Sequence, residues 1–406
     1  MKKHIIHTLI QKGVNIPNPE SIYISDDVNP DRISSENVIL YSGTKIIGKR
    51  SLIMKNVSIG YEAPVTLENT LVGENTQLNG GFFKGAVFAG HNTFGSGAHV
   101  RQGTILEELA NAAHCVALKQ TVLFPFVTLG SLINFCDCLM AGGTSRKDHS
   151  EVGSSFIHFN YTPNQDKATP SMMGDVHTGV MLKSRPIFLG GQGGMVGPVR
   201  IGYGCLSAAG TIIRKNELNE DRLLLGASFK EMSIPRQLDV YHNVPHVFNN
   251  NIVYIAGLFA LKAWYQHIRP LFVYDDFSNL LVQGLQENLL NCIQERMDQF
   301  FKFCDKLESS KNIFISKHKN TTSTIITVYE QALKKKKLIQ KTFNHALNEN
   351  FLNKTGSNFV CMVEQKIKDS NKNYINVIQN LNTVEQDLGT QWLFEIEQTI
   401  ASNLLI

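Results

Sequence analysis

Two basic side chains, those of Arg101 and Lys119, are separated by 18 residues, which is three times a six-residue repeat in the surrounding sequence. In a chain that coils with this repeat, the two residues lie one full turn apart on the same side. A guanidinium and an ammonium group that converge on a dianion make strong charge-assisted hydrogen bonds with it. The spacing is therefore suited to binding an anion, and the alternative is a pair of solvated charges on an exposed face.

Further along the chain lie side chains that can orient a substrate or accept a proton. The amide of Asn160 and the phenol of Tyr161 can position a polar substrate, although Asn-Tyr-Thr-Pro is also a good turn sequence. His149 and His158 carry imidazoles, which accept protons near neutral pH. For each histidine the alternative is a structural or solvent-exposed side chain with no role in catalysis.

Apolar residues recur every six positions through most of the first half of the chain. This period fits neither an α-helix nor a run of long strands. It is typical of a coil whose triangular turns consist of three short strands, each directing one aliphatic residue into a common core. We therefore predict a left-handed parallel β-helix, an exception to the right-handed rule for parallel crossovers. The apolar residues that recur with this period are Leu40, Ile46, Leu52, Phe88, Phe94, Val100, Leu106, Leu189, Met195, Ile201 and Ile213.

The sequence predicts three parts. Residues 1–36 form a lead-in with a short helix, and residues 37–235 form the β-helix. Residues 236–406 are predicted to be all-helical, because glycine becomes rare and apolar residues recur at helical spacing. The six-residue rhythm is irregular in 106–134 and 141–186, where we expect loops to leave the solenoid.

Composition excludes several classes of function. A formal charge of +4 over 406 residues gives no support for nucleic-acid binding. The seven cysteines are scattered without CxxC spacing, so we predict no metal site and expect reduced thiols in a cytoplasmic protein. The N-terminus lacks the features of a secretory signal, and the apolar stretch 252–261 is too short to span a membrane.

Several short motifs, in the same order, resemble those in the C-terminal acetyltransferase half of the bacterial bifunctional N-acetylglucosamine-1-phosphate uridyltransferase/glucosamine-1-phosphate acetyltransferase. The resemblance runs from about Leu9 to Asn216, roughly half of the chain. The matching segments are 21–28, which leads into the β-helix, 99–103 (the LRPG segment), 116–119 (VEVK), 158–161 (CNYDG), and 197–202 with 208–211 (the last coils).

The resemblance implies that an amino sugar phosphate or a nucleotide sugar is the acceptor. Arg101 and Lys119 would hold the sugar phosphate, and Asn160 and Tyr161 would position the amine and its neighbouring groups. Lys167 lies one position from a substrate-binding lysine of the family.

The resemblance also implies an acyl-CoA donor, acetyl-CoA in the simplest case. Gly191 and Ala209 would line its channel, because small side chains let the pantetheine arm approach. Enzymes of this fold are usually trimers, so a homotrimer is implied. Lipid A-type acyltransferases share the fold, but they too are expected to have a catalytic histidine within the coils.

The sequence departs from the family in its substrate site. Ser131 stands where the family has the histidine that acts as general base, and Asn134 stands where it has a nearby tyrosine. Serine alone cannot take the proton of an attacking amine, so His158 and His149 are the candidate replacements. The family's nucleotidyltransferase half has no counterpart here, and no pyrophosphorylase activity is expected. Two functions stay open, an acyltransferase and an inactive β-helix that binds sugar phosphates or a protein partner.

Overall fold

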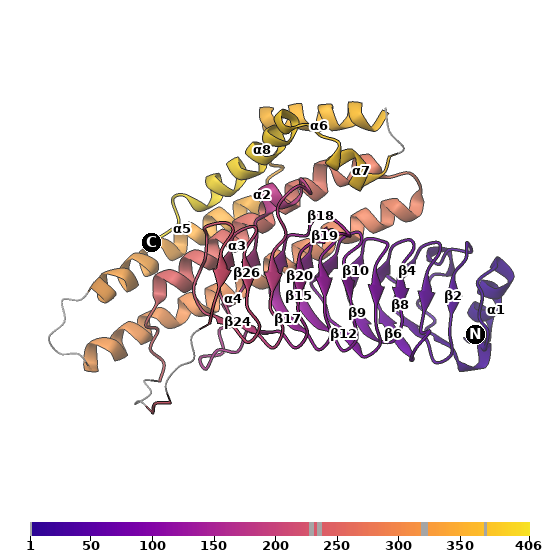
Figure 1. Ribbon diagram of the computed structural model, residues 1–406, viewed down its shortest axis with the longest axis horizontal. Coiled ribbons are helices and arrows are strands. Elements are labelled where there is room, and N and C mark those ends of the chain that lie inside the picture. The colour runs from indigo at the N-terminus through magenta and orange to yellow at the C-terminus, as the bar shows by residue number, and fades with distance from the viewer. Residues whose placement is uncertain (1, 227–230, 234–237, 318–323, 369–371) are drawn as a thin grey trace.

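The computed structural model describes residues 2–226, 231–233, 238–317, 324–368 and 372–406. Its first part is a parallel β-solenoid, and the α-helices of its C-terminal part lie along one side of that solenoid (Figure 1). The predicted fold class, a parallel β-helix followed by a helical region, is confirmed. The predicted boundary between residues 235 and 236 falls outside the described residues.

Each turn of the solenoid contributes strands to three faces, and strands of successive turns pair in parallel. Face 1 consists of β1 (Tyr23–Ile24), β3 (Lys45–Ile47), β6 (Val65–Glu68), β9 (Gly81–Lys84), β12 (Ala98–Val100), β15 (Ala117–Leu123), β17 (Asn134–Met140), β21 (Ile157–Phe159), β24 (Gly194–Val196) and β27 (Ile212–Ile213). Face 2 consists of β4 (Leu52–Ile53), β7 (Leu71–Val72), β10 (Ala86–Phe88), β13 (Thr104–Leu106), β22 (Ser171–Met173), β25 (Arg200–Ile201) and the second halves of β15 and β17.

Face 3 consists of β2 (Ile39–Leu40), β5 (Ser58–Ile59), β8 (Gln77–Leu78), β11 (Thr93–Phe94), β14 (Asn111–Ala112), β16 (Thr128–Leu129), β20 (Glu151–Val152), β23 (Phe188–Leu189), β26 (Leu206–Ser207) and β28 (Leu223–Leu224). The longer strands β15 and β17 turn the corner from face 1 to face 2. They do so at Gln120 and Asp137, whose φ angles are 51° and 63°. The left-handed backbone at these two residues redirects the chain without ending the strand.

The six-residue rhythm arises because one side chain per strand points into the solenoid. On face 1 these inward residues stack in register and are fully or almost fully buried; they include Leu67, Phe83, Val100, Leu118, Phe135, His158 and Met195. Phe83, Phe88 and Phe94 come from the three faces of one turn and meet edge to face in the core. Burial of these apolar side chains is the main force that holds the coil together.

The structure corrects one of the two expected excursions from the solenoid. Residues 106–134 stay within it, because β14, β15 and β16 pair with their neighbours on both sides. The rhythm is lost there because a turn holds 17 residues instead of 18, as in the pairing of Ala112 with Leu129. The second excursion is confirmed. It contains the hairpin β18 (Gly143–Ser145) and β19 (Asp148–His149), the loop 160–170, and the short helix α2 (Val176–Gly179).

Helices occupy both ends of the described chain. The lead-in contains α1 (Lys2–Lys12), followed by the 3-10 helices η1 (Pro19–Ser21) and η2 (Pro30–Arg32). The C-terminal part contains α3 (Val244–His267), η3 (Arg269–Phe272), α4 (Asp276–Lys317), α5 (Thr324–Asn348), α6 (Lys354–Lys368), α7 (Tyr374–Gln379) and α8 (Thr383–Ala401). Among the described residues, no helix is long and apolar enough to cross a membrane.

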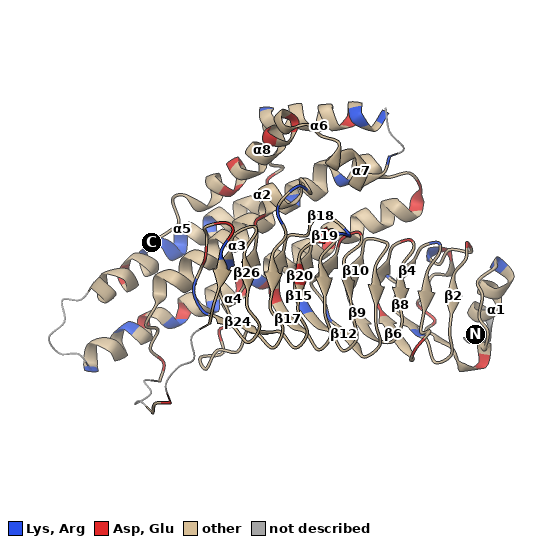
Figure 2. Cartoon of the chain, in the orientation of Figure 1, with Lys and Arg blue, Asp and Glu red and all other residues tan. Residues whose placement is uncertain are grey.

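Helix α4 covers face 2, where it contacts β4, β7, β10 and β13, and α3 contacts β22 (Figure 1). Gly284 lets α4 approach closely, because a Cβ atom there would lie 2.1 Å from Leu71 Cδ2. Lys and Arg residues are interspersed with Asp and Glu along the helices, and they form no single large patch in the view of Figure 2. A functional site must therefore be sought in local clusters.

Candidate functional site

A row of cations lies on the outer surface of face 1. Val100 pairs with Leu118 in adjacent turns, so the next residues, Arg101 and Lys119, lie side by side, as their spacing predicts. Lys84 precedes Arg101 in the same row, but its ammonium is paired with Glu68 at 2.8 Å. Adjacent parallel strands are about 4.8 Å apart, so the groups of Arg101 and Lys119 can both reach one phosphate.

Cys136 continues this row one turn beyond Lys119. Burial, and then the charge of Asp137, raise the pKa of the Cys136 thiol, while the nearby charges of Arg101 and Lys119 lower it in part. The thiol donates a long hydrogen bond to Asn134 Oδ1 (3.4 Å). A buried thiol with a raised pKa is a poor nucleophile, so Cys136 is no candidate for covalent catalysis.

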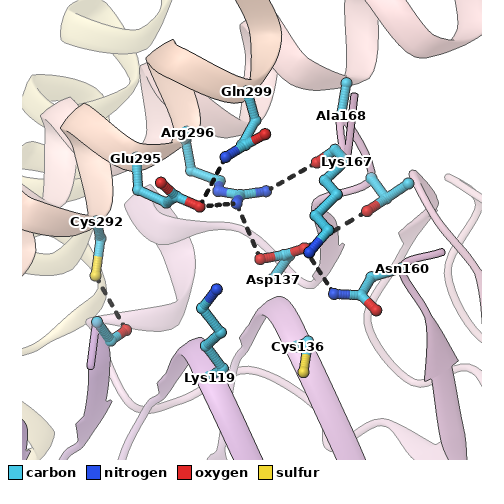
Figure 3. A network of polar contacts seen from close by, with 12 residues as sticks. Lys119, Cys136, Asp137, Asn160, Lys167, Ala168, Cys292, Glu295, Arg296 and Gln299 are labelled. Carbon is cyan, nitrogen blue, oxygen red and sulfur yellow. Dashed lines mark hydrogen bonds and ion pairs between the residues drawn. The ribbon is translucent and has the colours of Figure 1, made fainter. Parts of the chain in front are cut away.

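Asp137, at the corner between faces 1 and 2, is the centre of a buried polar network (Figure 3). Its carboxylate forms an ion pair with Arg296 of α4 at 3.0 Å, and the two side chains are only 3% and 2% exposed. It also accepts hydrogen bonds from Asn160 Nδ2 (3.3 Å) and Thr169 Oγ1 (3.5 Å). Sequence reasoning missed Asp137 and Arg296. The available signal was a lone carboxylate within the apolar strand 135–140.

The loop 160–169 brings two of the three predicted polar residues to this network. Asn160 bonds Asp137 directly, and the carbonyl of Lys167 accepts a hydrogen bond from Arg296 Nη1 at 3.4 Å (Figure 3). The Lys167 side chain is exposed, and Tyr161 is 79% exposed. The structure therefore places Asn160 close to the cation row, whereas the Tyr161 phenol lies in solvent.

The two predicted replacement bases lie away from the cation row. His158 points into the solenoid and is 2% exposed, and its Nε2 lies 2.7 Å from Ser171 Oγ. Burial lowers its pKa to about 4. His149 belongs to the hairpin at the corner between faces 2 and 3, with Nε2 3.8 Å from Glu151 Oε2. Neither imidazole in this position can reach a substrate bound at Arg101 and Lys119.

A histidine that sequence reasoning missed lies at the corner between faces 3 and 1. His114 Nδ1 is 2.9 Å from the hydroxyl of Ser131, the residue at the family's histidine position. The backbone N–H of Ser131 donates to Ser154 Oγ at 3.1 Å, which holds the serine in place. The two residues are separated by 17 positions, the length of the turn at this point of the coil, and this spacing was the signal in the sequence.

Small residues continue this corner toward the C-terminal end of the solenoid. The backbone N–H groups of Ser155, Gln192 and Gly210 each donate to the previous turn, at Ser131, Ser154 and Gly191 respectively. Ser131, Ser154, Gly191 and Ala209 therefore form one column along the corner, with His114 at its N-terminal end. A column without bulky side chains leaves room for an extended ligand to lie against the backbone.

The two groups of candidate residues occupy opposite edges of face 1. Arg101 and Lys119 end their strand segments next to face 2, whereas His114 and Ser131 precede theirs next to face 3. Asn134, whose side chain is exposed, lies on the outer surface between them. Face 1 thus carries a cationic edge, with Arg101 and Lys119, and an imidazole-bearing edge, with His114. The first is suited to holding an anion and the second to accepting a proton.

Curated proteins named bifunctional protein GlmU are similar to this chain. The chain is 26% identical over 217 residues to the protein of Nocardia farcinica, which covers 53% of this chain and 39% of the relative. It is 27% identical over 229 residues to that of Streptococcus equi subsp. zooepidemicus (56% and 43%). It is 27% identical over 212 residues to that of Thermotoga maritima (52% and 42%).

The chain thus spans about two fifths of the length of these relatives. This similarity confirms, for about half of the chain, the family resemblance found in its motifs. No family model matches the chain.

Proposed function

We propose that the protein is an acyl-CoA-dependent acyltransferase, with acetyl-CoA as donor and an amino sugar phosphate or a nucleotide sugar as acceptor. The observation that carries the proposal is the pair of adjacent cations, Arg101 and Lys119, on the solenoid of a chain similar to bifunctional protein GlmU. These two side chains hold the phosphate, and Asn160 and Tyr161 orient the acceptor. A cytoplasmic location and a homotrimer, both implied by the resemblance, complete the proposal.

In the proposed reaction, the acceptor amine attacks the thioester carbonyl, a C–N bond forms, and the C–S bond breaks to release CoA. The amine must lose a proton, and His114 accepts it. When Nδ1 of His114 carries a proton and donates it to Ser131 Oγ, Nε2 presents its lone pair to the amine. Gly191 and Ala209 line the path of the pantetheine arm along the corner between faces 3 and 1.

Thiol release tests this function directly. The purified protein is mixed with acetyl-CoA and either glucosamine 1-phosphate or an amino-sugar nucleotide, and the free thiol is measured with a thiol-reactive dye. We expect acceptor-dependent release that is strongly reduced in Lys119→Ala and Asn160→Ala at low acceptor concentration. Failure to release thiol with a panel of acyl-CoAs and acceptors, from correctly folded protein, would overturn the proposal.

The second candidate function is that of an inactive β-helix that binds sugar phosphates or a protein partner. It is favoured by one observation, the serine at the position of the family's histidine. The same experiment separates the two functions. A scaffold would bind glucosamine 1-phosphate, as measured by calorimetry, without releasing thiol.

A further inference from the structure

The loop 160–169, which we call the acceptor loop, leaves the solenoid between face 1 and face 2 and carries Asn160, Tyr161 and Lys167. Its described contacts with the rest of the chain come largely from the C-terminal part. Tyr241 donates its hydroxyl to Asp166 Oδ2 at 2.6 Å, and Asn251 Nδ2 donates to the carbonyl of Ala168 at 3.0 Å. The ammonium of Lys306 donates to the carbonyl of Asn164. The helical region therefore holds the part of the loop between 164 and 168.

Asp137 links the helical region to both ends of the loop. Its carboxylate accepts one hydrogen bond from Asn160, where the loop begins, and one from Thr169, where it ends. Arg296 pairs with the same carboxylate and also donates to the carbonyl of Lys167 (Figure 3). A buried charge is stable only when it is paired and hydrogen-bonded, so the ion pair strongly favours one arrangement of these groups.

The Asp137–Arg296 pair lies next to the cationic edge of face 1. Asp137 follows Cys136, which pairs with Lys119 in the adjacent turn, and Asn160 lies one further turn along. The loop also forms one wall of a cavity of about 280 Å³, whose other wall includes Val240, Tyr241 and Val247. A displacement of the loop would move Asn160 relative to Lys119 and change the shape of this cavity.

We propose that Arg296 is a positioning residue for the acceptor loop, and that the helical region is thereby part of the acceptor-binding site. The proposal rests on the proposed function for the identity of the ligand. Arg296 itself does not touch the substrate. It holds Asp137 and the Lys167 carbonyl, and Asp137 in turn holds Asn160.

The structure offers a matched control at the opposite edge of face 2. Arg269 of η3 forms a buried ion pair with Glu108 of the solenoid, with side-chain exposures of 5% and 15%. This pair also connects the helical region to the solenoid, but it makes no described contact with the acceptor loop. Arg269→Gln therefore reports what the loss of a buried helix–solenoid ion pair does by itself.

The test compares Arg296→Gln, Arg296→Lys and Arg269→Gln with the natural protein. Hydrogen–deuterium exchange of peptides within 157–170 measures the order of the loop, and calorimetry measures binding of glucosamine 1-phosphate and of inorganic phosphate. In Arg296→Gln we expect loop exchange to rise and glucosamine 1-phosphate affinity to fall, each about tenfold, with phosphate affinity unchanged. Arg296→Lys, which keeps the charge, restores part of both, and Arg269→Gln changes neither.

Unchanged loop exchange in Arg296→Gln, or an equal effect of Arg269→Gln on the loop, would overturn the proposal. If Arg296→Gln fails to fold, Tyr241→Phe makes the same comparison, because it removes the hydrogen bond to Asp166 of the loop while preserving side-chain shape. The natural protein could bind no sugar phosphate while Arg296→Gln still raises the exchange of the loop. That result would support the positioning role of Arg296 and overturn the proposed function. The two failures are therefore distinguishable.

Discussion

The imidazole of His114 lies 2.9 Å from the hydroxyl of Ser131, across two adjacent turns of the solenoid. This contact places an imidazole beside Ser131, which stands where the proteins that the chain resembles have a general-base histidine. Ser131 holds the orientation of the ring, and because a hydroxyl both donates and accepts, it does so for either tautomer of the imidazole. The pair can therefore act as a unit, in which His114 takes the proton and Ser131 orients the ring.

The first prediction concerns this pair. His114→Gln should lower kcat by about 100-fold or more, because general-base catalysis commonly contributes that much. Ser131→Ala should lower kcat less, since the imidazole remains but loses its orientation. Steady-state kinetics measures both effects.

His99→Gln is the matched control for this prediction. His99 is also an exposed histidine of face 1, but it stacks on Phe82 at 5.2 Å between ring centroids. Its replacement should leave kcat unchanged. An equal loss of rate in His99→Gln and His114→Gln would contradict the role assigned to the His114–Ser131 pair.

The second prediction concerns the cation row. Arg101→Gln and Lys119→Gln should each raise the KM for the phosphorylated acceptor about tenfold or more, because each removes a charge-assisted hydrogen bond to the phosphate. The KM for the acyl donor should not change. Lys84→Gln is the control, because Lys84 stands in the same row but already pairs with Glu68. If all three variants raise KM equally, the general positive charge of the face, rather than a specific site, attracts the acceptor.

The third prediction concerns stability and the buried His158. Burial lowers its pKa from the ordinary 6.5 to about 4, so the folded protein keeps this imidazole neutral where the unfolded chain protonates it. Stability should therefore fall as the pH falls from about 6.5 to 4, by an amount on the order of 3 kcal/mol. His158→Gln removes this titration and should flatten the loss. Urea unfolding at a series of pH values, compared between the two proteins, measures the difference.

The comparison of two proteins matters because Glu107 titrates in the same range with the opposite sign. Burial raises its pKa to about 7, so its contribution to stability is lost as the pH rises. Glu107 is present in both proteins, and its effect cancels in the difference between their curves. Parallel curves for the natural protein and His158→Gln would contradict the third prediction.

The sequence was sufficient to predict the coil and the placement of Arg101 beside Lys119 in the adjacent turn, because both follow directly from the six-residue period. A turn shortened to 17 residues was enough to hide the regular structure of 106–134, and with it the contact between His114 and Ser131. Local spacing also could not show that His158 points inward, because the sequence around it is as compatible with an exposed loop as with a strand. The side to which a residue points depends on the register of the whole turn.

The helical region contributed residues that no local pattern could assign to the site. Arg296 lies 159 positions from Asp137 and meets it only because α4 runs along face 2. Its helical spacing is that of any residue on a buried helix face, so the sequence gives no sign of its partner. Contacts between distant segments are determined by the packing of whole elements, which single-sequence periodicity does not reveal.

The last prediction concerns the assembly of the site. His114 and Lys119 lie at opposite edges of face 1, so a homotrimer can bring the edge of one copy to the opposite edge of its neighbour. If the site forms between copies, His114→Gln with its lowered kcat and Lys119→Gln with its raised KM should each be slow alone at low acceptor concentration. Activity should recover when the two are unfolded together and refolded as mixed trimers. With random mixing, about a quarter of the sites would combine an intact His114 with an intact Lys119. Native mass spectrometry verifies the mixed trimers, and thiol release measures the recovered rate. Mixed trimers without recovery would place both residues in a site within one copy, and a monomer in light scattering would exclude the trimer itself.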